Sequence, residues 1–226
     1  MINIQNLSKY YGAKHALNNV NIQFEKGKVY GIVGENGAGK TTLFRSIAGL
    51  EKYTGRIESD IDKFKNHLGF LQTIPFFFNK ISGKEYIRLL CNARSVNPGD
   101  IDERNIFDLP LNQYASTYST GMKKKLALTA ILMQENQAFI LDEPFNGVDI
   151  QSNIIIENII HKLKSLGKIV IISSHIFSTL SDTCDEINML KEGRLIRKVI
   201  KEDFKKLEAE MKAVSVGNKI EKLGLK

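Results

Sequence analysis

Hydrophobic and polar positions along the chain alternate between two kinds of strand pattern. Three nearly continuous apolar runs, Val29–Val33, Ala138–Leu141 and Lys168–Ser173, are typical of strands buried on both faces of a sheet. Two other segments, Met1–Gln5 and Val20–Phe24, alternate apolar and polar residues, as half-exposed antiparallel strands do. The chain is therefore expected to combine a buried central sheet with a separate antiparallel sheet at its N-terminus.

Helical spacing separates these runs. It predicts helices over Lys40–Leu50, Ser82–Arg94, Ile101–Leu109, Lys123–Gln134, Ile150–Leu166 and Lys201–Met211. Further strands are expected at Tyr53–Ser59 and Asn66–Gln72, and a closing hairpin from Asp185–Leu190 and Arg194–Val199. The stretch Pro75–Tyr118 has no strong strand pattern and is predicted to be a mainly helical insert. The elements together predict a single α/β domain.

Composition narrows the class of protein. The 226 residues are enough for one domain with a good core, and 42% hydrophobic and 25% charged residues are ordinary for a globular protein. No apolar run approaches the length of a membrane span, and the N-terminus lacks the apolar core of a signal peptide. Cys91 and Cys184 lack metal-type spacing and fit a reducing compartment. The net charge of +7 is compatible with anionic ligands or lipid headgroups. The sequence has no basic patch interleaved with aromatic residues, so nucleic acid is not expected as a partner.

A glycine-rich loop follows the first buried run. Residues 34–41, GENGAGKT, fit G-x-x-x-x-G-K-[ST] without substitution and lead into a predicted helix. Backbone N–H groups can surround phosphate oxygens where no Cβ intervenes, and the positive end of the helix dipole faces the same oxygens. Lys40 is expected to reach the β- and γ-phosphates, and Thr41 to bind Mg²⁺ through its hydroxyl. The loop predicts a site for a nucleoside triphosphate.

Candidate chemistry recurs where other strands end. Asp142 follows a buried strand, where a P-loop ATPase holds Mg²⁺, and Glu143 beside it is placed to polarise a water for attack on the γ-phosphate. Gln72 also follows a strand and is a candidate for contact with Mg²⁺ or the attacking water. His175 follows the strand Lys168–Ser173, at the sheet edge where open α/β sheets bind ligands. Tyr11, beside a glycine turn, offers a flat face to an adenine ring.

Taken together, these residues resemble the ATP-binding subunit of an ABC transporter, up to about Lys206. The motifs stand in that family's order. Tyr11 matches the adenine-stacking aromatic, Gly34–Thr42 matches Walker A, and Gln72 matches the Q-loop. They are followed by the signature at Tyr118–Met122, Walker B with its glutamate at Phe139–Glu143, the D-loop at Asn146–Asp149 and the switch histidine at His175. The signature departs from the usual L-S-G-G-Q at Tyr118, Thr120 and Met122. Ser119 and Gly121 remain, and they supply a hydroxyl and unobstructed N–H groups at a helix start.

The resemblance implies a fold and a set of roles. The fold is α/β: a P-loop NTPase core with a mixed or parallel central sheet and an N-terminal antiparallel β subdomain, formed by residues 1–74 and 135–226. A small helical subdomain, residues 75–134, carries the signature. The catalytic residues are Lys40, Glu143 and His175, and Mg²⁺ is bound by Thr41, Gln72 and Asp142. ATP is contacted by Tyr11, Gly34, Asn36, Gly37, Ala38, Gly39, Lys40, Thr41, Thr42, Gln72, Ser119, Gly121 and Asp149.

The resemblance also implies partners. Two copies, expected to be identical, pack head to tail so that Ser119 and Gly121 of one cover the ATP of the other. An integral membrane permease is the second partner, which places the chain in the cytoplasm, peripheral at the inner face of the membrane. The short insert between Gln72 and Ser119 favours an exporter, and Phe76–Phe78 is the expected docking patch for the permease.

Three other readings compete with a transporter subunit. A cofactor-assembly ABC ATPase without a membrane partner shares every motif, and co-sedimentation with membranes distinguishes it. A P-loop GTPase needs N-K-x-D, and neither Asn79–Ser82 nor Asn218–Glu221 has the aspartate, while a kinase has no use for the signature helix. A regulator that binds ATP without turnover is excluded if Glu143→Gln abolishes a measurable ATPase activity.

Overall fold

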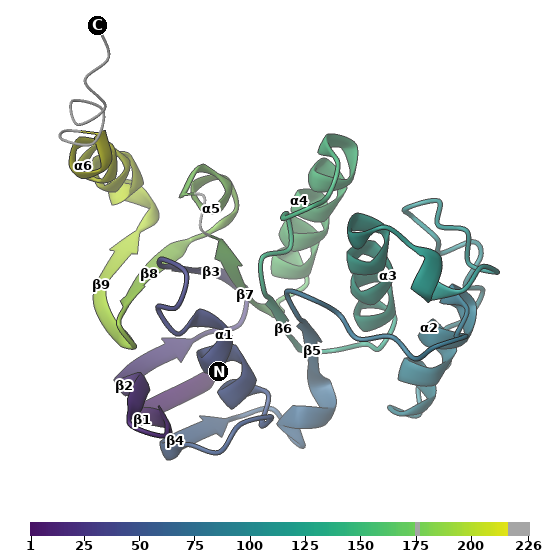
Figure 1. Cartoon of the computed structure of the whole chain (residues 1–226), viewed down its shortest axis with the longest axis horizontal. Coiled ribbons are helices and arrows are strands. Elements are labelled where there is room, and N and C mark those ends of the chain that lie inside the picture. Colours follow the sequence, from purple (N-terminus) through teal and green to yellow (C-terminus); the bar gives the residue numbers. More distant parts are fainter. Residues whose placement is uncertain (175–176, 217–226) are drawn as a thin grey trace, which may run out of the picture.

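Two sheets organise the molecule (Figure 1). The computed structural model describes residues 1–174 and 177–216. The smaller sheet is antiparallel, in the order β2-β1-β4, with β1 at Ile2–Tyr11, β2 at Lys14–Phe24 and β4 at Thr54–Ser59. The larger sheet has the order β5-β6-β7-β3-β8-β9. Its strands are β5 at Leu68–Leu71, β6 at Ala138–Leu141, β7 at Ile169–Ser174, β3 at Lys28–Val33, β8 at Glu186–Lys191 and β9 at Arg194–Ile200. Only β9 runs antiparallel to its neighbour in this sheet. The predicted α/β fold, with a mixed central sheet and an antiparallel N-terminal sheet, is confirmed.

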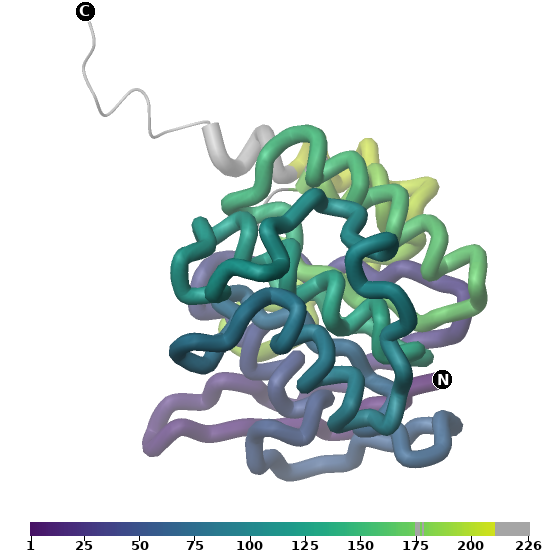
Figure 2. The backbone as a smooth tube through the Cα atoms, turned by 90° about the vertical axis from the view of Figure 1, so that its right-hand side faces the viewer, coloured from purple at the N-terminus to yellow at the C-terminus, as the bar shows by residue number. Residues whose placement is uncertain are grey.

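Helices cover both faces of the larger sheet. They are α1 at Lys40–Ile47, α2 at Gly83–Asn92, α3 at Thr120–Leu132, α4 at Ile150–Ser165, α5 at Phe177–Thr183 and α6 at Phe204–Val216. Helix α1 lies between the two sheets, and α4 and α5 lie on the far side of the larger one (Figure 1). Figure 2, seen from the side of α2 and α3, places the purple and blue strands of the small sheet at the edge opposite α4. In the part of the chain that the structure describes, no helix is both long enough and apolar enough to cross a membrane.

The larger sheet separates two hydrophobic cores. Alternation along β7 shows the division: Val170 and Ile172 pack with the helices of one face, whereas Ile169 and Ile171 pack with α1 and the small sheet. All four side chains are fully buried. The continuous apolar run in the sequence therefore reflects a strand with no exposed face.

The two N-terminal strands are longer than expected. The alternation predicted strands at Met1–Gln5 and Val20–Phe24, but β1 and β2 continue to a tight turn after Tyr11. Bulges at Asn6 and Asn19, both in the left-handed region with φ of 52° and 53°, shift the register of the pair. Each bulge turns the following side chains to the other face, so the apolar pattern loses its period of two although the ladder continues.

The predicted helix at Ile101–Leu109 is wrong. The segment is a series of turns, because its own side chains satisfy the backbone. The Asp100 carboxylate accepts from the N–H groups of Asp102 and Glu103, and the Asn105 side chain accepts from Leu109 N and donates to Leu109 O. The Asp100 bonds cap a single helical turn, closed by Arg104 N donating to Asp100 O. The two bonds between the Asn105 side chain and the Leu109 backbone then replace ladder bonds and end the turn.

Helix α3 begins earlier than predicted. It starts at Thr120 rather than at Lys123. Gly121 therefore lies in the first turn of the helix, two residues after the capping residue Ser119.

Candidate functional site

The glycine-rich loop wraps around the ammonium group of its own lysine. Lys40 Nζ donates to Gly34 O at 2.6 Å and to Glu35 O at 3.2 Å, and the side chain is only 7% exposed. The glycines at the two ends of the loop are required sterically. A Cβ on Gly34 would lie 2.3 Å from Leu190 O, and one on Gly39, whose φ is 109°, would lie 2.6 Å from Ala16 O. The loop is thus held as a tight backbone cradle at the start of α1, a geometry suited to phosphate oxygens.

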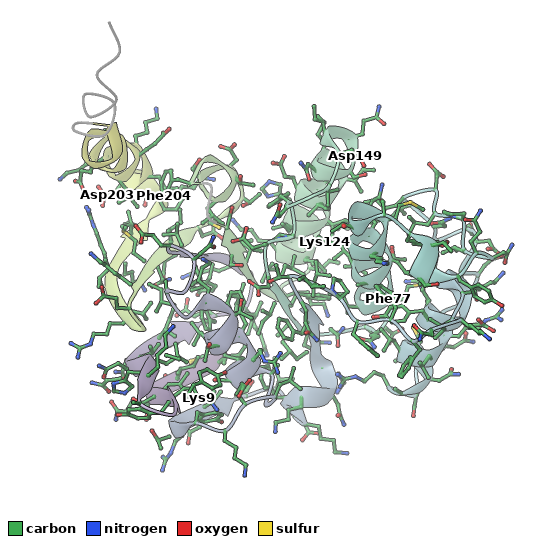
Figure 3. All side chains as sticks on the ribbon, viewed as in Figure 1. Lys9, Phe77, Lys124, Asp149, Asp203 and Phe204 are labelled. Carbon is green, nitrogen blue, oxygen red and sulfur yellow. The ribbon has the colours of Figure 1, made fainter. Side chains whose placement is uncertain are left out.

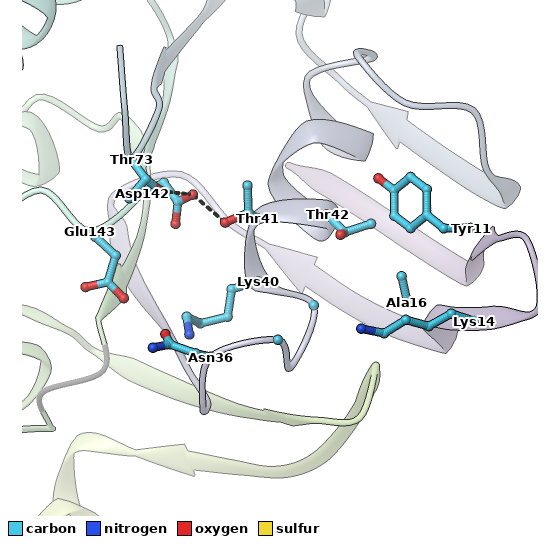
Figure 4. A pocket seen from close by; sticks show the side chains of 12 residues that line it. Tyr11, Lys14, Ala16, Asn36, Lys40, Thr41, Thr42, Thr73, Asp142 and Glu143 are labelled. Carbon is cyan, nitrogen blue, oxygen red and sulfur yellow. Dashed lines mark hydrogen bonds between the residues drawn. The ribbon is translucent and has the colours of Figure 1, made fainter.

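Three hydroxyl groups converge on the carboxylate of Asp142, at the carboxyl end of β6. Thr41 and Thr73 donate to Oδ2 at 2.8 and 2.7 Å (Figure 4). Ser173 donates to Oδ1 at 2.6 Å. The donors come from α1, from the segment after β5 and from β7. Parallel strands end at one edge of a sheet, and this brings together residues far apart in sequence. Asp142 is 1% exposed, so its orientation is fixed by these bonds.

The donor set fits Mg²⁺. Mg²⁺ in nucleotide sites is bound by one or two carboxylates together with substrate phosphates and water, not by an all-protein cage. Asp142 supplies a carboxylate, and Thr41 supplies a hydroxyl beside the cradle. Among the described residues there is no cluster of three or more His, Cys, Asp or Glu that would hold a cation without a substrate.

Glu143 has a strained backbone. Its φ is 52°, in the left-handed region that non-glycine residues rarely occupy. Its N–H donates to Ser173 Oγ at 2.9 Å, and its carbonyl accepts from Lys124 Nζ at 2.7 Å. The carboxylate is turned toward the same pocket as Asp142 and Lys40 (Figure 4). Such strain persists where the surroundings fix it, and it is common at functional sites.

The pocket extends from these groups to an aromatic side chain at its other end. Tyr11 is 46% exposed and lines the pocket together with Lys14 and Ala16 (Figure 4). Lys9 Nζ lies 4.7 Å from the centroid of the Tyr11 ring and forms an ion pair with Glu51 at 3.0 Å. The hydrogen bond from Lys9 is the main cause that lowers the pKa of Glu51. The ring is thus held at the mouth of the pocket by a partly buried ion pair.

The signature segment lies at a different place. Ser119 caps α3, its Oγ accepting from Met122 N at 3.2 Å, and both Ser119 and Thr120 are exposed. A Cβ on Gly121 would lie 2.5 Å from Gly147 O, so the helix start packs directly against the loop after β6.

That loop ends at Asp149, which caps α4. Its carboxylate accepts from Ser152 N at 2.9 Å and from Lys125 Nζ at 3.1 Å. The hydrogen bonds from Ser152, first, and then from Lys125 hold the pKa of Asp149 well below its usual range. The carboxylate is therefore a fixed charge between α3 and α4 (Figure 3).

The structure brings together many of the predicted site residues but not all. Of the residues that it describes, those lining the pocket are Tyr11, Lys14, Ala16, Asn36, Gly37, Gly39, Lys40, Thr41, Thr42, Thr73, Asp142 and Glu143. Gln72, which is half-buried, is not among them, nor are Gly34, Ala38, Ser119, Gly121 and Asp149. His175 lies outside the described residues.

Sequence reasoning missed five residues at this site: Lys14 and Ala16, which line the pocket near Tyr11, and three that contact its acidic pair. Thr73 and Ser173 bond to Asp142, and Lys124 bonds to the Glu143 carbonyl. The hydroxyl residues carried a signal, because Thr73 follows a predicted strand and Ser173 ends one. Nothing in the sequence sets Lys124 apart from the neighbouring lysines Lys123 and Lys125.

Comparisons with known proteins agree on one family. The sequence model of the ABC transporter family matches residues 17–146. The lantibiotic transport ATP-binding protein SrtF of Streptococcus pyogenes is 34% identical over 87% of this chain and 89% of its own length. The bacitracin transport ATP-binding protein BcrA of Bacillus licheniformis is 32% identical over 91% of this chain and 72% of its own length.

The fold is shared with a solved structure. CbiO1 of Clostridium perfringens, described as part of the ABC transporter complex CbiONQ, is 27% identical. It superimposes with a TM-score of 0.75 over 95% of both chains. Sequence and structure thus point to the same class of nucleotide-binding protein.

Proposed function

The chain belongs to the ABC transporter family as an ATP-binding subunit, an ATPase, and from this we propose that it drives export through a separate membrane permease. The observation that carries the proposal is the bond between Thr41 of the P-loop and Asp142 of β6, in a pocket that Glu143 also lines. The names of SrtF and BcrA support a peptide antibiotic as the class of cargo. The division into a core, residues 1–74 and 135–226, and a helical subdomain, residues 75–134, is part of this proposal.

The pocket assigns the parts of ATP to its two ends. The adenine ring stacks on Tyr11, and the triphosphate lies in the loop around Lys40, whose ammonium exchanges the Gly34 and Glu35 carbonyls for phosphate oxygens. Thr41 and Asp142 bind Mg²⁺, which neutralises charge on the phosphate oxygens. Gln72 and His175 remain predicted contacts of the metal or water and of the γ-phosphate.

Hydrolysis needs a water aligned with the γ-phosphate. Glu143 accepts a hydrogen bond from that water and orients it, while Lys40 stabilises the charge of the transition state. The left-handed backbone at Glu143 supports this role, because it directs the carboxylate back over the pocket instead of along the strand. Asp142, which accepts from three hydroxyl groups, lies on the same side of the site.

A second copy of the chain completes the site. Ser119 and Gly121 do not line the pocket of their own chain in the described structure, and Ser119 is exposed at the start of α3. A helix N-terminus with an exposed hydroxyl group suits the γ-phosphate of a nucleotide bound by another copy. Two copies then close on two ATP molecules, and hydrolysis reopens them.

The docking patch for the permease comprises Ile74, Phe76 and Phe78, which are 82%, 69% and 54% exposed. Phe77 belongs to the core instead, because its ring packs against Tyr86 with centroids 4.5 Å apart (Figure 3). Exposed apolar side chains of this size are typical of an interaction surface.

ATP hydrolysis and dimerisation are tested with one variant. Wild-type protein should hydrolyse ATP with Mg²⁺, and Glu143→Gln should lose the activity while retaining ATP. Light scattering with saturating Mg-ATP should then show a dimer of Glu143→Gln. A Glu143→Gln protein that remains monomeric beside its permease, or that hydrolyses ATP at the wild-type rate, contradicts the proposal.

The membrane partner is tested by co-purification. Phe76→Asp with Phe78→Asp should prevent co-sedimentation with the co-expressed permease and leave ATP binding intact. Leu166→Asp, at an exposed leucine after α4, is the matched control. If the double variant sediments with the permease as the control does, the patch is not the docking site; if the wild type never sediments with membranes, the transporter reading is replaced by an ATPase without a permease.

A further inference from the structure

One lysine of the signature helix is buried. Lys124 lies in α3 and is 2% exposed, although its neighbours in sequence reach solvent (Figure 3). Its Nζ donates to Glu143 O at 2.7 Å and to Asn146 O at 2.8 Å. Burial lowers the pKa of Lys124, and the charges of Glu143 and Asp142 act in the opposite direction. Burying a cation costs desolvation energy unless hydrogen bonds or ion pairs compensate for it. The two carbonyls that accept from Lys124 are therefore the contacts from which its role is inferred.

The first carbonyl belongs to the strained residue of the site. Glu143 has a φ of 52°, and its backbone is held on both sides, the N–H by Ser173 Oγ at 2.9 Å and the carbonyl by Lys124. Ser173 fixes the residue to β7, and Lys124 fixes it to α3. The direction in which the Glu143 side chain leaves the backbone thus depends on both elements.

The second carbonyl, that of Asn146, belongs to the turn that follows Glu143. Asn146 N donates to Glu143 O at 3.2 Å, and the ammonium of Lys124 bridges the carbonyls of the same two residues. The turn leads to Gly147, against which Gly121 of α3 packs. Helix α3 and the turn are therefore joined at two points, Gly121 and Lys124, which lie about 3 Å and about 7.5 Å of helical rise from the exposed Ser119.

We propose that Lys124 is a positioning residue, which holds the left-handed backbone of Glu143 and ties it to the helix whose exposed start covers a second nucleotide. The inference rests on the proposed function, because it assigns Lys124 an effect through Glu143. It touches neither the phosphate cradle nor the Tyr11 end of the pocket. Its removal should therefore change turnover and leave nucleotide affinity unchanged.

The test substitutes an apolar side chain of similar length. Lys124→Met should lower kcat roughly 10- to 100-fold, the effect of a misplaced catalytic group. The dissociation constant of a non-hydrolysable ATP analogue should stay within about twofold of the wild type, since that constant reports ground-state binding alone. Thr129→Val is the matched control, a buried α3 residue whose hydroxyl donates within its own helix, to Lys125 O at 2.9 Å, and it should retain the wild-type kcat.

A double-mutant cycle separates positioning from a general structural effect. Glu143→Gln should lose turnover, so its residual hydrolysis is measured in single turnovers with excess enzyme. In that background Lys124→Met should not lower the residual rate further, because the group on which it acts is already absent. If Lys124→Met does not fold, Lys124→Gln, with a neutral donor on a shorter side chain, is measured against the same expectations. A Lys124 variant with wild-type kcat, or one whose loss persists undiminished in the Glu143→Gln background, overturns the inference.

Failure of this inference and failure of the proposed function give different results. If Glu143→Gln hydrolyses ATP at the wild-type rate, the proposed function fails. If Glu143→Gln abolishes hydrolysis and Lys124→Met does not lower it, the role of Lys124 alone is rejected.

Discussion

Ser173 connects the two acidic residues of the pocket through one hydroxyl group. It donates to Asp142 Oδ1 at 2.6 Å and accepts from Glu143 N at 2.9 Å, and the side chain is fully buried. Ser173→Ala removes both bonds at once.

The magnitude follows from the two partners. A hydrogen bond to a charged group contributes about 1.5–3 kcal/mol, and a buried N–H without a partner costs about 1–3 kcal/mol. Because one hydroxyl makes both bonds, the losses overlap, and we expect a decrease of about 3 kcal/mol in the free energy of unfolding. For a chain of this size that corresponds to about 6–12 °C in Tm.

Ser46→Ala is the matched control. Ser46 is 1% exposed, and its hydroxyl donates at 2.8 Å to Thr42 O, which also accepts the helical N–H bond. Its loss should cost less than about 1 kcal/mol, since no buried group is left without a partner. Calorimetric Tm values and urea midpoints give the comparison. If Ser173→Ala and Ser46→Ala melt within about 3 °C of each other, the bonds of Ser173 do not hold the site as argued.

Two further predictions concern the ends of the site. Tyr11→Ala should raise the dissociation constant of ATP roughly 5- to 150-fold, from the loss of about 1–3 kcal/mol of base stacking. Tyr10→Ala should leave that constant unchanged, because Tyr10 stacks on His15 away from the pocket; equal effects of the two variants in equilibrium titrations would reject the stacking role. The pKa of Asp149 is held low in the folded protein, chiefly by the hydrogen bond from Ser152 N. The ionised carboxylate therefore contributes its full stabilisation above the pKa that Asp149 has in the unfolded chain. This stabilisation is lost as the pH falls through the lower pKa of the folded protein. The difference in urea midpoint between wild type and Asp149→Ala should be full at pH 7 and shrink below about pH 4, and a difference independent of pH would contradict this.

The fold was predictable where one physical factor dominates. The apolar run of β7 is buried on both faces, and Ser82 with Glu85 forms the capping box that starts α2. The prediction failed where local polar bonds override periodicity. Asn6 and Asn19 shift the register within β1 and β2, and the bonds of the Asn105 side chain to the Leu109 backbone replace the helical bonds that would continue the turn after Asp100. Such bonds depend on positions in space that the pattern of apolar residues does not encode.

The site was predictable from motifs at the level of the phosphate cradle and the acidic pair. The sequence placed Lys40, Asp142 and Glu143 in one pocket, and the structure has all three there. It could not show that Thr73 rather than Gln72 contacts Asp142, because the direction of a side chain after a strand end depends on how the strand stops. The buried state of Lys124 likewise depends on the packing of α3 against a loop twenty residues away.

The segment from Asp142 to Asp149 connects the nucleotide pocket with the start of α3, the two places that the proposed cycle uses. Its first residues lie in the nucleotide pocket, and Gly147 packs against Gly121 at the start of α3. Its last residue is bound by Lys125 of the same helix. These contacts place the start of α3 and the nucleotide pocket on one continuous segment. In the cycle proposed above, this segment is the route by which a change in the pocket would reach the exposed Ser119.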